Sequence, residues 1–223
     1  MIQLIDIAKI YPAGAGVRAL EGVNLTIRDG EYVGILGPSG SGKSTLLNLL
    51  GLLDTPTSGV LRYDDRDTTT FTDAELSRFR GRAIGFVFQS FHLINHLSVV
   101  ENVELPLFYQ GVPPRERRAR AEAHLAAVNL GHRLFHRPRQ LSGGECQRTA
   151  IARALVTDPP MILADEPTGN LDSKSGQEIL AIFDALHQQA KTLVVITHDL
   201  TVAKRIPRIV HIADGVLTEG EAR

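Results

Sequence analysis

The chain has 223 residues, of which 43% are hydrophobic and 22% are charged, and its formal net charge is −1. A chain of this length can bury one sizeable core, and its near-neutral charge argues against a nucleic-acid-binding surface. The single cysteine, Cys146, excludes a disulfide within the chain and fits a reducing compartment. The first residues lack the pattern of a signal peptide, and the longest apolar cluster, 46–53, is too short to cross a bilayer. We therefore expect a cytoplasmic polypeptide.

The N-terminal part of the chain is predicted to be rich in β-strands. Residues 2–10 begin with alternating apolar and polar residues, and two further strands are expected at 17–20 and 23–27, separated by a turn at Glu21-Gly22. Tyr11 follows the first strand at an exposed position. Its ring either stacks on a nucleotide base or is an ordinary edge aromatic, and spacing alone leaves both open.

A phosphate-binding pattern, G-x-x-x-x-G-K-[ST], occupies residues 37–45. An apolar strand at 32–36 precedes it and a leucine-rich helix follows it, which is the context that this pattern requires. Glycines let backbone N–H groups approach phosphate oxygens, and the positive end of the helix adds to their attraction. Lys43 supplies a cation for the β- and γ-phosphates, and the Ser44 hydroxyl can ligate Mg²⁺. The residues predicted to bind a nucleoside triphosphate here are Gly37, Pro38, Ser39, Gly40, Ser41, Gly42, Lys43, Ser44 and Thr45.

Residues 91–140 change character and predict a helical subdomain inserted into an α/β core. Ser98 is expected to cap a helix that Pro106 bends or breaks. A second helix is expected at 115–130, with Gly131 as its C-terminal cap. We therefore expect a single domain over 1–223, with residues 1–90 and 141–223 forming the β-subdomain and P-loop core, and about 91–140 forming the helical subdomain, its end extending into the next helix.

Three apolar strands end in polar side chains: Gln89, the pair Asp165-Glu166, and His198. The carboxyl ends of parallel strands gather along one sheet edge, so these groups are expected to converge on one triphosphate. Asp165 is suited to the Mg²⁺ shell, and Glu166 to polarising an attacking water. Helix-capping charges would be the ordinary interpretation of such a pair, but Pro167 follows directly. His198 is expected to donate to the γ-phosphate.

A second anion-binding element follows the inserted segment, where Ser142, Gly143 and Gly144 open a helix. The loop at 37–45 is already expected to bind the phosphates of one nucleotide. A second phosphate site in one chain suggests that it completes the nucleotide of another subunit.

Together these motifs resemble the ATP-binding subunit of ABC (ATP-binding cassette) transporters over essentially the whole chain. The segment LSGGE at 141–145 resembles the family's signature motif, and ILADEPT at 162–168 resembles its Walker B motif. By the same resemblance, Tyr11 matches the A-loop, Gln89 the Q-loop, Asp172 the D-loop and His198 the switch histidine. The fold that this implies is α/β, a P-loop NTPase core with an N-terminal antiparallel β subdomain and an inserted α-helical subdomain.

The resemblance also implies a mechanism. Two copies would pair head to tail, each ATP lying between residues 37–45 of one copy and Ser142, Gly143, Gly144 and Glu145 of the other. Tyr11 would stack on adenine, while Ser44, Gln89 and Asp165 would hold Mg²⁺. Glu166 would act as the general base, helped by Lys43, Gln89 and His198, and Asp172 would communicate across the dimer. The ATPase would sit at the cytoplasmic face of the membrane and drive a separate permease.

A subgroup is suggested by the segments FVFQSFHLI at 86–94 and ENVELPL at 101–107, which are similar to the MacB/LolD branch of lipoprotein release and macrolide efflux. Two departures stand out. Ile94-Asn95 replaces the usual Leu-Pro, and Cys146 replaces the usual Gln. The cargo, lipoprotein, macrolide or peptide, depends on the permease.

Two other interpretations remain open. The chain can be an ATPase that regulates envelope or cell-wall remodelling through a permease-like partner that transports nothing. It can also be a soluble, nucleic-acid-linked ABC ATPase, although it has neither the long coiled coils nor the second cassette of such proteins, and its charge is near neutral.

Overall fold

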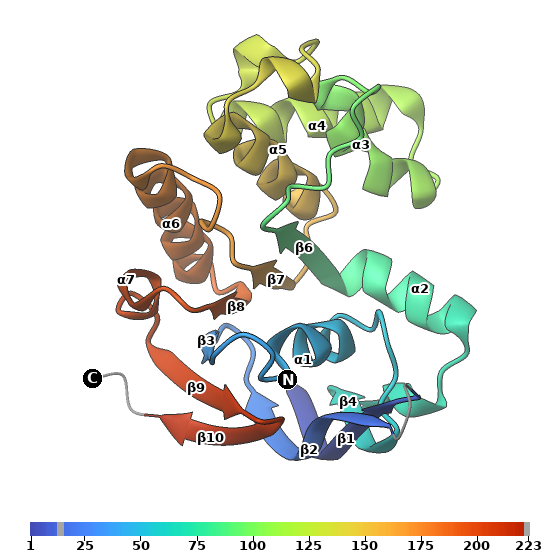
Figure 1. The fold of residues 1–223 in the computed structure, drawn as a ribbon. Helices are drawn as coiled ribbons and strands as arrows, with labels where there is room; N and C mark the ends of the chain where they lie inside the picture. The colour runs from blue at the N-terminus through green and yellow to red at the C-terminus, as the bar shows by residue number, and fades with distance from the viewer. Residues whose placement is uncertain (13–15, 221–223) are drawn as a thin grey trace. The chain divides into compact units, whose positions relative to one another are not determined.

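The computed structural model describes residues 1–12 and 16–220, and they form two compact units (Figure 1). The first unit consists of Met1–Arg80 and Leu186–Arg223, and the second of Gly81–Ala185. The first unit is therefore made of two separate stretches of chain, whereas the second is continuous.

The first unit contains an antiparallel sheet in the order β2-β1-β4-β5. Its strands are β1 (Ile2–Tyr11), β2 (Val17–Ile27), β4 (Ser58–Tyr63) and β5 (Arg66–Asp67). Apolar side chains on alternate positions of β1 and β2 are buried, which is the pattern of a sheet with one face against a core. This sheet is the antiparallel β subdomain that the resemblance implies.

The two short strands expected at 17–20 and 23–27 are instead one strand, β2. The predicted turn at Gly22 is a bulged position, where the glycine has a φ of 58° and the ladder to β1 shifts register. Asn24 fills the gap: its amide nitrogen donates to the Gly22 carbonyl at 3.0 Å, and its amide oxygen accepts from the Asp6 N–H at 2.9 Å. A bulge keeps the two halves in one strand where a turn would have separated them.

A second group of strands in this unit carries the phosphate-binding loop. Strand β3 (Tyr32–Leu36) lies between β8 (Thr192–Thr197) and β9 (Arg208–Ala213) and is parallel to both. Strand β10 (Val216–Gly220) pairs antiparallel with β9 through a tight turn at Asp214-Gly215, both of which have positive φ. All five residues of β3 are buried, as expected for a strand covered on both faces.

In the part of the first unit that the structure describes, three α-helices begin: α1 (Lys43–Leu50), α2 (Asp73–Ala83) and the short α7 (Leu200–Ala203). Helix α1 buries four leucines, Leu46, Leu47, Leu49 and Leu50. The Tyr63 hydroxyl donates to the carbonyl of Leu50 and so satisfies a group at the end of this helix. The N-terminus of α2 is capped: the N–H and hydroxyl of Thr72 donate to the Glu75 carboxylate, and the Glu75 N–H donates back to the Thr72 hydroxyl at 3.4 Å.

The second unit contains a parallel strand pair and four helices. Strands β6 (Ile84–Phe88) and β7 (Met161–Asp165) pair in register, Phe88 with Asp165. The helices are α3 (Val99–Tyr109), α4 (Pro114–Ala127), α5 (Gly143–Leu155) and α6 (Ser173–Gln188), the last running just past the boundary of the unit. In Figure 1, α3, α4 and α5 gather around one buried cluster, whose centre includes Val103, Leu107, Leu125 and Ala152.

Two expectations about these helices need correction. Of the two outcomes expected at Pro106, a bend or a break, the break does not occur, because α3 continues to Tyr109. Proline inside a helix costs about 3 kcal/mol, but the fully buried Val103 and Leu107 lie on both sides of it and contribute about 1.5–3 kcal/mol each. The expected helix 115–130 ends at Ala127, and Asn129, at a φ of 59°, takes the left-handed position expected of Gly131. Throughout residues 1–12 and 16–220, no helix has the length and apolarity to cross a membrane.

Candidate functional site

The loop before α1 has the features of an anion site. Gly42 is the N-cap residue of the helix, with a φ of 103°, and no side chain caps the N–H groups behind it. The first turn carries no acidic residue, so nothing opposes the positive end of the helix dipole. The Lys43 ammonium bends back to the loop, donating to the carbonyls of Gly37 at 2.7 Å and Pro38 at 2.6 Å. Uncapped N–H groups and a cation therefore lie together, as a polyphosphate requires.

Close packing fixes the backbone of this loop. A Cβ atom on Gly37 would lie 2.2 Å from the carbonyl oxygen of Ile212, and one on Gly42 would lie 2.6 Å from that of Ala19. The backbone of Ser41 accepts a hydrogen bond from the N–H of Gly215 at 3.0 Å, so the β9–β10 turn also holds the loop. The glycines are needed as much for packing against the sheet as for turning.

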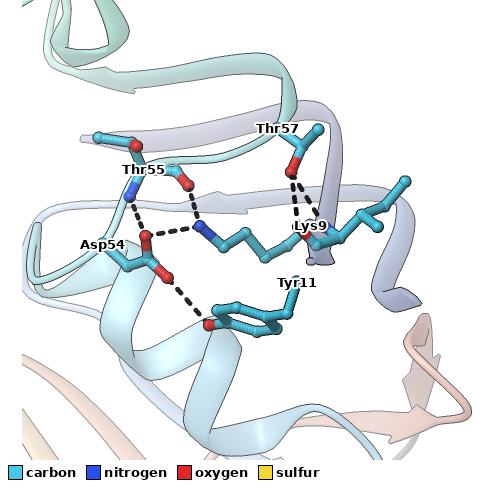
Figure 2. Close-up of polar contacts among 6 residues, drawn as sticks. Lys9, Tyr11, Asp54, Thr55 and Thr57 are labelled. Atoms are coloured by element: carbon cyan, nitrogen blue, oxygen red, sulfur yellow. Dashed lines mark hydrogen bonds and ion pairs between the residues drawn. The ribbon is translucent and has the colours of Figure 1, made fainter. Parts of the chain in front are cut away.

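Tyr11, the predicted base-stacking residue, stands in a polar cluster with Lys9 and Asp54 (Figure 2). Its hydroxyl donates to Asp54 at 2.9 Å, and the Lys9 ammonium lies 4.9 Å from the centre of its ring. The ring is half-buried and not fully exposed as the sequence suggested. Burial, followed by the hydrogen bond to Asp54, raises the pKa of Tyr11.

His198 follows β8 and is exposed. The next residue, Asp199, caps α7 and accepts from both the N–H and the hydroxyl of Thr201 at 2.7 Å. These two bonds hold the pKa of Asp199 below its ordinary value. Strand β8 is thus followed directly by a short helix that Asp199 caps.

In the second unit, Gln89 follows β6 and lies against the loop after β7. Its amide nitrogen donates to the Asn170 side chain at 3.4 Å, and Asn170 donates back to the Gln89 carbonyl at 3.1 Å. A Cβ atom on Gly169 would lie 2.6 Å from the Gln89 amide nitrogen. Since the Gly169 N–H donates to the Glu166 carbonyl at 3.0 Å, Gln89 packs on the turn that carries Glu166. The segments after β6 and β7 are therefore in contact.

Glu166 itself has a φ of 45°, the left-handed region that a residue with a side chain seldom occupies. Asp165, one residue earlier, ends β7 in the extended conformation. The backbone therefore changes direction abruptly between the two carboxylates.

The serine loop at the start of α5 is a capping box. Ser142 accepts from the Glu145 N–H at 3.2 Å, and the Glu145 carboxylate accepts from the Ser142 N–H at 2.8 Å. Arg133 donates to the other oxygen of Glu145 at 2.9 Å and lies 3.1 Å from a ring nitrogen of His136. The Ser142 N–H lowers the pKa of Glu145 most, burial opposes this, and Arg133 lowers it further.

Next to this loop, Asp172 caps α6 by accepting from the N–H of Ser175 at 3.0 Å and from its hydroxyl at 2.7 Å. A Cβ atom on Gly144 would lie 2.7 Å from the same hydroxyl. The signature glycines are therefore packed against the start of α6. Cys146, one turn into α5, is buried, and its thiol donates to the Pro138 carbonyl at 3.6 Å.

Three residues near these motifs were not predicted: Asp54, Arg133 and Arg153. Arg153 donates to the backbone carbonyls of Phe91 at 2.7 Å and His92 at 2.5 Å, two residues with positive φ in the loop after Gln89. Each of these three residues contacts a motif that lies elsewhere in the sequence, so no short sequence pattern identifies it. A charged residue in a largely apolar stretch, such as Asp54 after the leucines of α1, is the only signal available.

Comparison with known proteins gives the family. A sequence model described as "ABC transporter" matches residues 20–169. An uncharacterized ABC transporter ATP-binding protein of Thermotoga maritima is 53% identical over 224 residues, covering 100% of this chain and 96% of its own length. The macrolide export ATP-binding/permease protein MacB of Bartonella henselae is 50% identical over 96% of this chain, which spans 33% of that protein.

A solved structure extends the match to the fold. The ATP-binding cassette MJ0796, in a dimeric post-hydrolysis state bound to ADP and Pi, is 46% identical and superposes with a TM-score of 0.92, covering 100% of this chain and 99% of that one. The predicted fold class and the resemblance to MacB-type cassettes are confirmed. The chain belongs to the ABC transporter family, as an ATP-binding subunit with an ABC-type ATPase fold.

Proposed function

We propose that two copies of this chain bind two molecules of MgATP between them and hydrolyse them to drive a separate membrane permease. The observation that supports the proposal is that two helices of one chain begin at glycine-rich loops: α1, whose N-terminus has no side-chain cap, and α5, which begins after Ser142 with Gly143 and Gly144. One nucleotide needs only one such loop, so the second fits the nucleotide of another copy. The related cassette MJ0796 was solved as a dimer with ADP and Pi, which supports this arrangement.

In this proposal, Lys43 binds the β- and γ-phosphates, and Tyr11 stacks on adenine. Glu166 is the general base for the attacking water, and His198 donates to the γ-phosphate. The second copy completes the site. Its Asp172 and its loop of Ser142, Gly143, Gly144 and Glu145 contact the nucleotide that the first copy binds.

The proposed Mg²⁺ ligands are Ser44, Gln89 and Asp165, which offer a hydroxyl, an amide and a carboxylate oxygen. Mg²⁺ prefers oxygen donors and usually takes only one or two from protein, the rest coming from phosphates and water. Ser44 follows the phosphate-binding Lys43 in the first turn of α1, which suits a metal bridging phosphate oxygens. When bound, the ion would neutralise charge that develops on the phosphates.

The partner and the place in the cell follow from the relatives. MacB proteins join an ATP-binding part to a permease part, and this chain matches about a third of such a protein. We place the ATPase at the cytoplasmic face of the membrane, bound to a permease that exports or extracts a macrolide, lipoprotein or peptide.

The proposal is tested by Glu166→Gln. Removing one catalytic group costs about 10²–10⁴ in rate, so ATP hydrolysis should fall by that factor while ATP binding stays and an ATP-dependent dimer accumulates in gel filtration. Glu116→Gln, at an exposed ion pair of α4, is the matched control and should hydrolyse ATP normally. Near-normal hydrolysis by Glu166→Gln would refute the assigned base, and a fully active monomer would refute the shared site.

A further inference from the structure

Asp54 makes a series of contacts that the nucleotide-binding motifs do not account for (Figure 2). One carboxylate oxygen accepts from the Tyr11 hydroxyl at 2.9 Å. The other accepts from the Lys9 ammonium at 2.6 Å and from the N–H of Thr55 at 2.7 Å. Three donors, two from β1 and one from the loop after α1, therefore fix the orientation of this carboxylate.

Lys9 completes the cluster. Its ammonium also donates to the Thr55 carbonyl at 2.7 Å, and it lies 4.9 Å from the centre of the Tyr11 ring. The Lys9 side chain is only 11% exposed, and that of Asp54 is 28% exposed, so water screens their ion pair less than it screens a surface pair. Figure 2 shows the Lys9 side chain running alongside the ring towards Asp54. The Tyr11 ring is thus fixed by the hydrogen bond of its hydroxyl to Asp54, and the Lys9 ammonium lies over the ring.

Asp54 is attached to the helix that begins at the phosphate loop. The backbone N–H groups of Leu53 and Asp54 both donate to the carbonyl of Asn48, at 2.8 and 3.3 Å, so the chain turns back on the end of α1. Helix α1 has eight residues, about 12 Å at 1.5 Å per residue. Through Asp54, Tyr11 on β1 is therefore connected to the C-terminal end of the helix that forms the phosphate site.

We propose that Asp54 is a positioning residue for nucleotide binding, which with Lys9 fixes the Tyr11 ring at a set distance from the phosphate loop. The inference rests on the proposed function, in which Tyr11 is the platform for adenine. Asp54 touches no part of the nucleotide and acts only through Tyr11. A Tyr11 ring that is already fixed loses less conformational freedom when the base binds. Asp54 should therefore change the affinity for ATP and not the rate of its hydrolysis.

The test is the steady-state kinetics of ATP hydrolysis by Asp54→Ala. We expect KM for ATP to rise about tenfold, the effect of losing one charge-assisted hydrogen bond, while kcat stays within about twofold. Tyr11→Phe, which keeps the ring and loses the hydroxyl, should raise KM by a similar factor. The double variant should be no worse than either single variant, because both remove the same contact.

Two control variants distinguish a loss of Tyr11 positioning from a general loss of stability. Asp54→Asn keeps an oxygen that accepts from the Tyr11 hydroxyl and should recover most of the lost affinity. Asp64→Ala removes an exposed carboxylate of the same unit, paired with the amino group of Met1, and should leave KM unchanged. Urea unfolding of each variant then shows whether KM follows stability.

The outcomes distinguish this inference from the function on which it rests. If the unaltered chain does not hydrolyse ATP, the proposed function fails. If it does, and Tyr11→Ala raises KM while Asp54→Ala does not, the positioning role of Asp54 is refuted alone. Additive effects of Tyr11→Phe and Asp54→Ala, or a fall in kcat with KM unchanged, also refute it.

Discussion

The sharpest structural test of the phosphate loop is the substitution Gly37→Ala. The added Cβ atom would lie 2.2 Å from the carbonyl oxygen of Ile212 and 2.7 Å from the Ser41 hydroxyl oxygen, whereas real Cβ contacts essentially never fall under 3.0 Å. Ile212 is paired with Leu217 in the β9–β10 ladder, so its carbonyl cannot swing away without breaking strand pairing.

The size of the effect follows from this rigidity. Overpacking costs about 1–3 kcal/mol where side chains can adjust, and occasionally more. Because the nearest atom belongs to a paired backbone, we expect Gly37→Ala to lower the free energy of unfolding by about 3 kcal/mol. Gly40→Ala is the matched control: no atom lies within 4 Å of its added Cβ, but its φ is +79°. Left-handed backbone costs about 1–2 kcal/mol, and the lower entropy of the unfolded chain offsets about 0.4–1 kcal/mol, leaving about 1 kcal/mol.

The measurement is urea unfolding of both variants, followed by circular dichroism, with the slope m compared to confirm a common unfolded state. ATP affinity should fall with Gly37→Ala, because the loop must move. If Gly37→Ala is no less stable than Gly40→Ala, the argument from packing against β9 is wrong.

Three further predictions concern ionisable groups. Arg133→Gln should move the pKa of Glu145 part of the way back to its ordinary value, since the larger contribution of the Ser142 N–H remains; NMR titration of labelled glutamate checks this, and an unmoved pKa contradicts it. Hydrogen bonds from Ser98 lower the folded-state pKa of Glu101, as those described above lower the pKa values of Glu145 and Asp199. The stabilisation from these three carboxylates is complete above their unfolded-state pKa values of about 4 and is lost as pH falls through their folded-state pKa values. Urea unfolding at pH 7, 5, 4 and 3 should show this loss below about pH 4, and equal stability at pH 5 and 3 would exclude it. Burial raises the pKa of Cys146, so a thiol reagent at pH 8 should modify the native chain far more slowly than the urea-unfolded one, and equal rates would refute this.

Local patterns predicted most of the strands that carry motifs. Strand β3 and the loop after it are specified within a short stretch, because an apolar run, glycines and a leucine-rich helix follow one another. Strands β6, β7 and β8 were found for the same reason: each is a short apolar run that ends at a polar residue. The resemblance supplied the antiparallel sheet, which periodicity alone had not paired.

The failures have a common physical cause, since each needed knowledge of tertiary contacts. The bulge at Gly22 depends on Asn24 meeting Asp6 of the neighbouring strand. The continuation of α3 through Pro106 depends on burial of the residues around it. Sequence patterns report the intrinsic conformational preference of a residue. At Gly22 and at Pro106, tertiary packing overrides that preference.

The unpredicted residues of the site show the same limit. Asp54 reaches Tyr11 across 43 residues, and Arg153 reaches Phe91 across 62. Side chains this far apart in the sequence meet at no characteristic spacing, so no sequence motif reveals the contact. The extent of the helical subdomain, about 91–140, and the roles of the site residues stay predictions.

The discontinuity of the first unit has a consequence for the order of events during synthesis. Strand β3 leads into the phosphate loop, yet both of its neighbours, β8 and β9, come from the stretch after Leu186. A ribosome adding about 5–20 residues per second needs roughly 8–30 seconds to make the intervening chain. The phosphate loop leaves the ribosome early but acquires the strands beside it late, and Gly81–Ala185, one continuous stretch, can fold in the interval. We therefore expect a nascent chain to bind nucleotide stably only after β8 and β9 have been made.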